Sequence, residues 1–166
     1  MLILGVDPGI QNTGYAILKV AGGTAEIEKY GIIETNSAMP FEKRLKKIYD
    51  HLVEIIEQFQ PAVLALEEVF YSRNVKVALK LGHARGVTLI AAANYGIPAA
   101  EYSPREIKQA VTGNGNASKH QVQQMIIHLL NLHSAPSQFD MSDAMAVAYC
   151  HSQRIKTESR IKRNSI

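Results

Sequence analysis

The chain has 166 residues, 46% of them hydrophobic and 20% charged, which is the composition of an ordinary globular domain rather than of a disordered or fibrous chain. No apolar run is long enough to span a bilayer, and the first residues enter an apolar strand without a basic segment before it. The single cysteine, Cys150, cannot form an internal disulfide. We therefore expect no signal peptide, no membrane contact and a reducing, cytoplasmic location.

The formal net charge of +3 is unevenly distributed. Residues 154–166 contain five basic residues and one acidic residue, a net of +4, so the rest of the chain carries −1. So polar a segment cannot bury enough apolar surface to fold alone. The sequence predicts one domain over residues 1–153 and a disordered basic tail over residues 154–166, which would favour nucleic acid non-specifically.

The N-terminal part has the pattern of three strands. Residues 2–6 are almost continuously apolar, as in a central strand covered on both faces, and Asp7-Pro8-Gly9 follows as a turn. Residues 13–20 and 25–35 have the pattern of the next two strands, joined by a glycine turn at 22–23. Together they predict an antiparallel meander.

A helix and a fourth strand follow. Apolar residues recur at steps of three and four over residues 40–60, which predicts an amphipathic helix, and residues 62–66 form a short buried strand that stops at Glu67. A right-handed crossover would place this strand parallel to the first. Asp7 and Glu67 would then lie at the carboxyl ends of adjacent parallel strands, where α/β sheets usually have their sites.

The second half of the chain alternates helices with one more short strand. After a loop at 69–74, helices are predicted over residues 75–95, 104–113, 119–132 and 137–154, and a fifth strand over residues 96–102. The predicted fold class is α/β, a five-stranded mixed sheet of three antiparallel strands followed by two parallel strands, flanked by helices.

The positions of three aspartates each allow a structural explanation and a chemical one. They are Asp7, Asp140 and Asp143. Asp7 is a charge where a buried strand meets a loop, and the turn's own N–H groups could satisfy it. Asp140 and Asp143 are three residues apart at a helix start and share a face, which apolar residues continue. A capping box with Ser137 accounts for Asp140 but not for a second inward aspartate.

Taken together, four carboxylates predict a metal site. Asp7, Glu67, Asp140 and Asp143 come from two strand ends and one helix start. Hard cations such as Mg²⁺ prefer oxygen ligands, and four crowded carboxylates would repel one another without cations. Two ions roughly 3.5–4 Å apart can hold an attacking water and a leaving oxygen on one phosphodiester.

Five stretches in a fixed order carry a family resemblance. They are LGVDPGIQNTGYAIL, LALEEVFYSRN, KLGHARGV, EYSPREIKQAVTGNGNASKHQV and FDMSDAMAVA. Over residues 1 to about 151 the sequence resembles RuvC-type Holliday junction resolvases, which are endonucleases of the ribonuclease H-like superfamily. The resemblance implies a ribonuclease H-like fold and resolution of Holliday junctions, in recombination and repair, by paired and symmetric metal-dependent hydrolysis. The main departure is Met141-Ser142 between the two aspartates, where the family has small apolar residues; we expect it to be tolerated.

The resemblance also implies roles for individual residues. Asp7, Glu67, Asp140 and Asp143 would be catalytic and bind two Mg²⁺ ions per subunit, which Mn²⁺ can replace. Phe70 would stack on a DNA base, and Lys108 and Lys119 would contact DNA near the scissile strand. The implied partners are four-way junction DNA, a second subunit in a homodimer, and the RuvA–RuvB branch-migration complex. The helix at 75–95 is the candidate dimer contact, with Leu81, Val87 and Leu89.

Other interpretations stay open at this point. Lys108 and Lys119 could be ordinary solvated lysines, Phe70 could be a core residue, and the helix at 75–95 could be a core helix. The chain could also be a related ribonuclease H-like nuclease that acts on structured RNA, or a non-catalytic junction-binding module. The Asp-x-Gly and Thr-Gly pattern also occurs in actin-like ATPases and sugar kinases, but one domain of this size is too small for those.

Overall fold

The computed structural model describes residues 1–68 and 74–164. Its strands form one sheet in the order β3-β2-β1-β4-β5, in which β1 pairs antiparallel with β2 and parallel with β4. β2–β3 is antiparallel and β4–β5 is parallel. The strands are β1 Leu2–Asp7, β2 Asn12–Ala21, β3 Thr24–Glu34, β4 Val63–Glu67 and β5 Ala99–Tyr102. The predicted five-stranded mixed sheet is confirmed.

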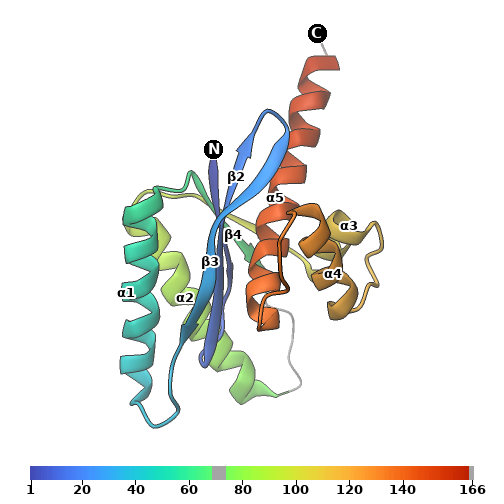
Figure 1. Ribbon diagram of the computed structural model, residues 1–166. Helices are drawn as coiled ribbons and strands as arrows, with labels where there is room; N and C mark the ends of the chain where they lie inside the picture. Colours follow the sequence, from blue (N-terminus) through green and yellow to red (C-terminus); the bar gives the residue numbers. More distant parts are fainter. Residues whose placement is uncertain (69–73, 165–166) are drawn as a thin grey trace.

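Helices cover both faces of the sheet. α1 (Phe41–Phe59) and α2 (Val75–Asn94) lie on one face, and α3 (Pro104–Thr112), α4 (Lys119–Leu129) and α5 (Phe139–Asn164) lie on the other (Figure 1). Strand alternation divides the core accordingly: Leu4 and Val6 pack with α1 and α2, whereas Ile3 packs with α3, α4 and α5. No helix among the described residues is long and apolar enough to cross a membrane.

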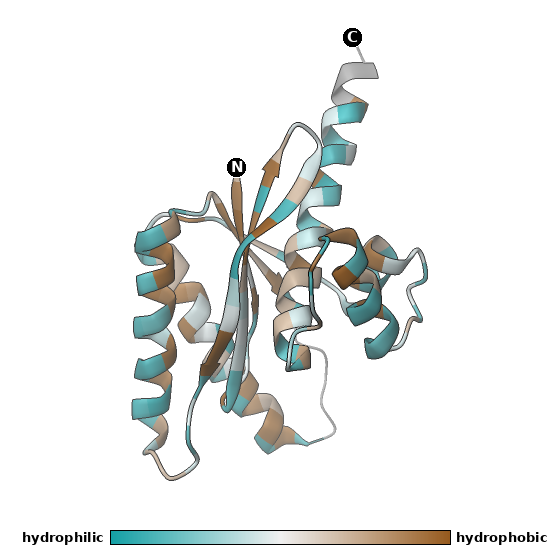
Figure 2. Cartoon of the chain, in the orientation of Figure 1, coloured by the Kyte–Doolittle hydropathy of each residue, from teal (hydrophilic) through white to brown (hydrophobic). Residues whose placement is uncertain are grey.

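α1 has the amphipathic character that its sequence predicts. Ile48, Leu52 and Ile56 are buried against the sheet, and hydrophobic and hydrophilic residues alternate along α1 (Figure 2). The helix ends where Gln60 adopts a left-handed conformation with φ 47° and donates its N–H to the carbonyl of Ile56. The predicted boundaries agree with these to within one residue.

α5 lies directly on the centre of the sheet because two glycines face it. A Cβ atom at Gly5 would lie 2.2 Å from the carbonyl oxygen of Ala144, and a Cβ atom at Gly14 would lie 2.0 Å from that of Asp140. Only glycine permits this approach, so Gly5 on β1 and Gly14 on β2 fix how closely the first turns of α5 approach the strands.

The end of the chain differs from the sequence prediction. We expected a disordered tail from residue 154, but α5 continues to Asn164, and the predicted domain boundary at 153 falls inside this helix. The residues of α5 beyond the predicted boundary make contacts within the helix and with the rest of the domain. Arg154 Nε lies 2.9 Å from Glu158 Oε1, Lys156 Nζ donates to the carbonyl of Gly23, and Ile155 packs against the core. Contacts with the β2–β3 hairpin thus stabilise a segment whose composition alone predicted disorder.

Candidate active site

Two carboxylates lie side by side at the carboxyl edge of the sheet. Asp7 ends β1 and Glu67 ends β4, and the parallel register pairs the preceding residues, Val6 and Leu66. Val6 and Leu66 belong to the core on the side of α1 and α2. Alternation therefore directs the Asp7 and Glu67 side chains to the opposite face, toward α5. This is the arrangement that the sequence predicted.

The first turn of α5 brings the two other carboxylates to this edge. Asp7 is paired with Gly14 across the β1–β2 ladder, and Gly14 lies against the backbone of Asp140. Asp143 follows one turn later, with 17% of its side chain exposed. α5 begins at Phe139, so a capping box from Ser137, which would need a helix starting at residue 138, is out of register.

Burial and like charge raise the pKa values of the strand carboxylates. The pKa of Asp7 is raised from 3.8 to about 7, first by burial and then by the charges of Asp143, Glu67 and Asp140. The pKa of Glu67 is also raised, first by burial and then by Asp143. A cation bound between these groups would remove the repulsion, so the electrostatics favour cation binding at this edge.

Lys119 and Lys108 both lie within electrostatic reach of the carboxylates. Lys119 Nζ is 2.9 Å from Asp143 Oδ2, and this bond is the main cause that raises the pKa of Lys119. Lys119 and Lys108 each lower the pKa of Glu67. The Lys119 side chain is 69% exposed, so it is solvated and ion-paired at once. Both residues thus lie at the rim of the carboxylate cluster.

The donor set matches a hard divalent cation, since it offers carboxylate oxygens from separate elements. Within residues 1–68 and 74–164, no three acidic, histidine or cysteine side chains are arranged as ligands around one point. The ammonium group of Lys119 is the cation that lies beside Asp143. Asp7, Glu67, Asp140 and Asp143 are therefore candidate metal ligands by their donor chemistry, and not by a preformed coordination geometry.

The loop after Asp7 is held by residues that sequence reasoning missed. The Gly9 N–H donates to Thr13 Oγ1, and that hydroxyl donates back to the Gly9 carbonyl at 2.6 Å. The turn's glycine amide is therefore bonded to Thr13 rather than to the Asp7 carboxylate. The buried Arg44 of α1 donates to the Ile10 carbonyl at 3.0 Å. An arginine within an amphipathic helix gives no local signal of such a role.

The predicted stacking residue, Phe70, lies outside the described residues. Its contact with a DNA base stays a prediction, as does the alternative that it is a core residue.

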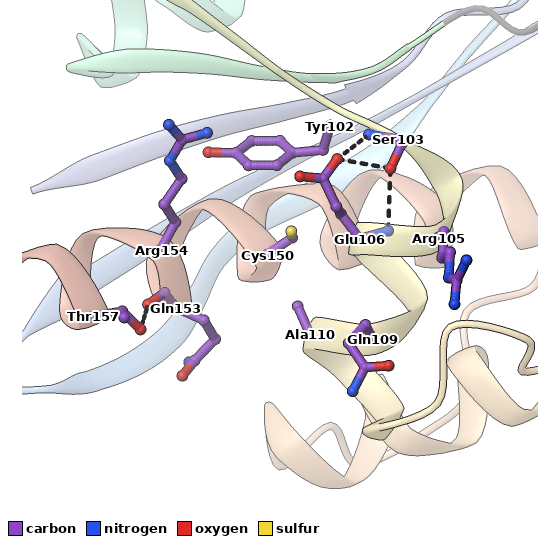
Figure 3. A pocket seen from close by; sticks show the side chains of 10 residues that line it. All are labelled: Tyr102, Ser103, Arg105, Glu106, Gln109, Ala110, Cys150, Gln153, Arg154 and Thr157. Atoms are coloured by element: carbon purple, nitrogen blue, oxygen red, sulfur yellow. Dashed lines mark hydrogen bonds between the residues drawn. The ribbon is translucent and has the colours of Figure 1, made fainter.

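A separate cavity of about 460 Å³ lies between α3 and α5 (Figure 3). Tyr102, Cys150 and Arg154 are among its lining residues, and the four carboxylates are not. The Tyr102 hydroxyl lies 2.5 Å from His151 Nδ1. Burial raises the pKa of the Cys150 thiol to about 12, so this thiol is not a nucleophile near neutral pH. The cavity is therefore separate from the four carboxylates at the edge of the sheet.

Comparisons with known proteins identify the family of this chain. The family model described as "Crossover junction endodeoxyribonuclease RuvC" matches residues 3–151. A RuvC protein from Desulforamulus reducens is 46% identical over 92% of this chain and 94% of its own length. One from Citrifermentans bemidjiense is 51% identical over 91% and 92%.

Among solved structures, RuvC of T. thermophilus in complex with a Holliday junction substrate superposes with a TM-score of 0.90. It is 32% identical, and the match covers 95% of this chain and 96% of the other. The family model and the near-complete relatives show that the chain belongs to the RuvC family of crossover junction endodeoxyribonucleases.

Proposed function

We propose that this chain resolves Holliday junctions by metal-dependent hydrolysis of one phosphodiester on each of two opposing strands. The observation that carries the proposal is the gathering of Asp7, Glu67, Asp140 and Asp143 at one edge of the sheet, with burial and like charge raising the pKa values of Asp7 and Glu67. The RuvC homologue solved with a junction substrate supports the same substrate for this chain.

The four carboxylates would hold Mg²⁺ ions, two per subunit, and Mn²⁺ would serve in their place. Such ions, when bound, supply charge neutralisation and a bound water of lowered pKa. The protein's own part is to hold four oxygen ligands on rigid elements, two strand ends and one helix. Lys108 and Lys119, at the rim, offer positive charge to the phosphates of the scissile strand. Phe70 would stack on an unpaired base at the junction centre.

Two further candidate functions differ in substrate or in chemistry. A related nuclease of the same fold could cleave structured RNA, and a junction-binding module would not cleave at all. Cleavage of a four-way DNA junction and of a structured RNA, each with Mg²⁺, separates them. We expect symmetric nicks in the DNA junction only.

The carboxylates are tested by isosteric substitution. Asp7→Asn, Glu67→Gln, Asp140→Asn and Asp143→Asn each remove a ligand charge and keep the side-chain shape, so we expect cleavage to be lost. Junction affinity should persist because basic groups supply most phosphate contacts. Asp50→Asn is the matched control, because Asp50 is on α1 and pairs with Lys46. Near-normal nicking by any of the four variants would remove that residue from the site.

The proposed assembly is a homodimer, because two symmetric nicks need two active sites related by a two-fold axis. α2 supports this with exposed apolar side chains, among them Val75, Leu79 and Ile90. Within the cell we propose action in recombination and repair together with the RuvA–RuvB complex. The reducing cytoplasm is the expected compartment, since Cys150 is a free, buried thiol.

A further inference from the structure

One arginine joins three elements behind the candidate active site. Arg85 comes from α2, and its Nη1 donates to the backbone carbonyl of Glu67 at 2.7 Å. Its Nη2 lies 2.5 Å from Glu101 Oε2 on β5. Only 13% of the Arg85 side chain is exposed, compared with 44% for Glu101. The guanidinium therefore lies largely under the surface, with one fixed partner on each of two parallel strands.

The Glu67 carbonyl needs this donor because the sheet cannot supply one. The N–H of Glu68 donates to the Tyr102 carbonyl at 2.8 Å, on β5. The Glu67 carbonyl belongs to the same planar trans peptide, so it points the other way, toward β1. The register places Val6 beside Leu66, so the next donor on β1 would come from residue 8. That residue is Pro8, which has no N–H.

The peptide between Glu67 and Glu68 is thus held at both of its polar atoms. β5 accepts its N–H, and Arg85 donates to its carbonyl. This is the peptide at which β4 ends, and fixing its plane fixes the direction in which the Glu67 side chain leaves the backbone. That side chain lies on the α5 face, toward Asp143, whereas Arg85 acts from the α2 face.

We propose that Arg85 is a positioning residue for the nuclease reaction. It orients the Glu67 carboxylate by donating a hydrogen bond to the Glu67 backbone carbonyl, to which Pro8 on the neighbouring strand has no N–H to donate. The inference rests on the proposed function, since it needs Glu67 as a metal ligand. Arg85 touches neither metal nor DNA in this role. It also links the active site to α2, the helix that presents exposed apolar side chains.

The test compares Arg85→Gln with a control variant, Lys19→Gln. The control breaks an exposed ion pair between Lys19 on β2 and Glu28 on β3. Mn²⁺ affinity is measured by calorimetry with the metal alone, and cleavage is measured as a single-turnover rate at saturating junction. Loss of a residue that orients a metal ligand typically lowers affinity or activity about 10- to 100-fold. We expect a loss of this size in both quantities for Arg85→Gln, an unchanged junction Kd, and wild-type values for Lys19→Gln.

Two more variants keep the test decisive. Arg85→Lys retains the charge and one donor, so it should recover part of both quantities. Glu101→Ala leaves Arg85 in place without its second anchor and should show a smaller loss of the same kind, which keeps the test open if Arg85→Gln does not fold. Wild-type Mn²⁺ affinity and cleavage rate in both Arg85→Gln and Glu101→Ala would overturn the inference. The inference would also be overturned if the losses of Mn²⁺ affinity and cleavage rate disappeared after correction for the fraction of each variant that is folded.

Glu67→Gln, measured in the same assays, separates a failure of the proposed carboxylate site from a failure of the role of Arg85. Wild-type cleavage by Glu67→Gln would overturn the proposed carboxylate site itself. An inactive Glu67→Gln beside a fully active Arg85→Gln would overturn only the role of Arg85.

Discussion

We expect Asp7 to destabilise the metal-free fold at neutral pH. Its pKa in the folded protein is raised to about 7, well above the ordinary 3.8 that the unfolded chain has, so between about pH 4 and pH 7 the folded state holds this proton and the unfolded state does not. The free energy of unfolding should therefore fall as pH rises through that window. Asp7→Asn should remove this part of the pH dependence and stabilise the metal-free protein at pH 8 by up to about 4 kcal/mol, since a shift of roughly three pKa units counts about 1.4 kcal/mol per unit.

Urea unfolding in EDTA at pH 5, 6, 7 and 8 measures this effect, with Asp50→Asn as the control. Excess Mg²⁺ should reduce the difference between wild type and Asp7→Asn, because a bound cation favours the ionised carboxylate. Equal pH slopes for wild type and Asp7→Asn in EDTA would show that Asp7 is not the group responsible.

The two rim lysines are expected to act by phosphate contact. Lys108→Ala and Lys119→Ala should each weaken junction binding and reduce the slope of log K against log salt by roughly one unit per lost contact. Lys43→Ala is the control, because Lys43 is an exposed residue of α1, on the opposite face of the sheet. Unchanged slopes for both rim variants would favour the interpretation of these residues as ordinary solvated lysines.

At the scale of elements, the position of α5 depends on glycines that lie against it. Gly14→Ala would force a Cβ atom against the Asp140 carbonyl, so α5 must move away from the sheet. We expect a loss of about 1–3 kcal/mol in the free energy of unfolding, the usual cost of overpacking. Cleavage should fall further than stability predicts, because Asp140 and Asp143 move with the helix. Urea unfolding and single-turnover cleavage measure the two effects.

Gln58→Ala is the control for this substitution. Gln58 is an exposed residue of α1, on the other face of the sheet, and alanine is at least as favoured as glutamine within a helix. It should unfold at the same or higher urea concentration than wild type and cleave at the wild-type rate. A Gly14→Ala protein as stable and as active as Gln58→Ala would contradict the close packing of α5 on β2.

The sequence predicted the elements better than their contacts. Periodicity and turn residues placed every strand and helix of the described chain, because these signals are local. The crossover rule then placed Asp7 beside Glu67 without any coordinates. The roles of Gly14 and Arg85 were missed, because each depends on a partner that is distant in sequence: Asp140 in one case and Glu67 in the other. Hydrogen bonds such as that of Lys156 to Gly23 likewise explain why the tail is helical where its composition predicted disorder.

At the scale of the whole molecule, α2 presents one stripe that no described part of the chain covers. Val75, Leu79 and Ile90 are 69%, 58% and 50% exposed, and Gly82 and Gly86 lie between them with open space above. These five residues follow one another at sequence spacings of four, three, four and four, which keeps them on one face of the helix. The buried Ala84 and Thr88 lie on the opposite face.

This stripe changes the expected dimer contacts. The sequence named Leu81, Val87 and Leu89, but Val87 and Leu89 pack against the chain's own core. The stripe of Val75, Leu79, Gly82, Gly86 and Ile90 is the better candidate, since its two glycines permit close approach of a second helix. The first turns of α2 are also rich in hydrophobic residues (Figure 2).

The double variant Leu79→Glu/Ile90→Glu tests whether this stripe joins two subunits. Burying two carboxylates in an apolar contact is costly, so we expect the variant to sediment as a monomer at micromolar concentration where wild type sediments as a dimer. Its junction products should shift from paired cuts to single nicks, because each active site then acts alone. Ile161→Glu, at a 60% exposed residue of α5, is the control and should stay dimeric. A wild-type protein that is monomeric both free and on a junction would refute the dimer, and a dimeric double variant would place its interface elsewhere.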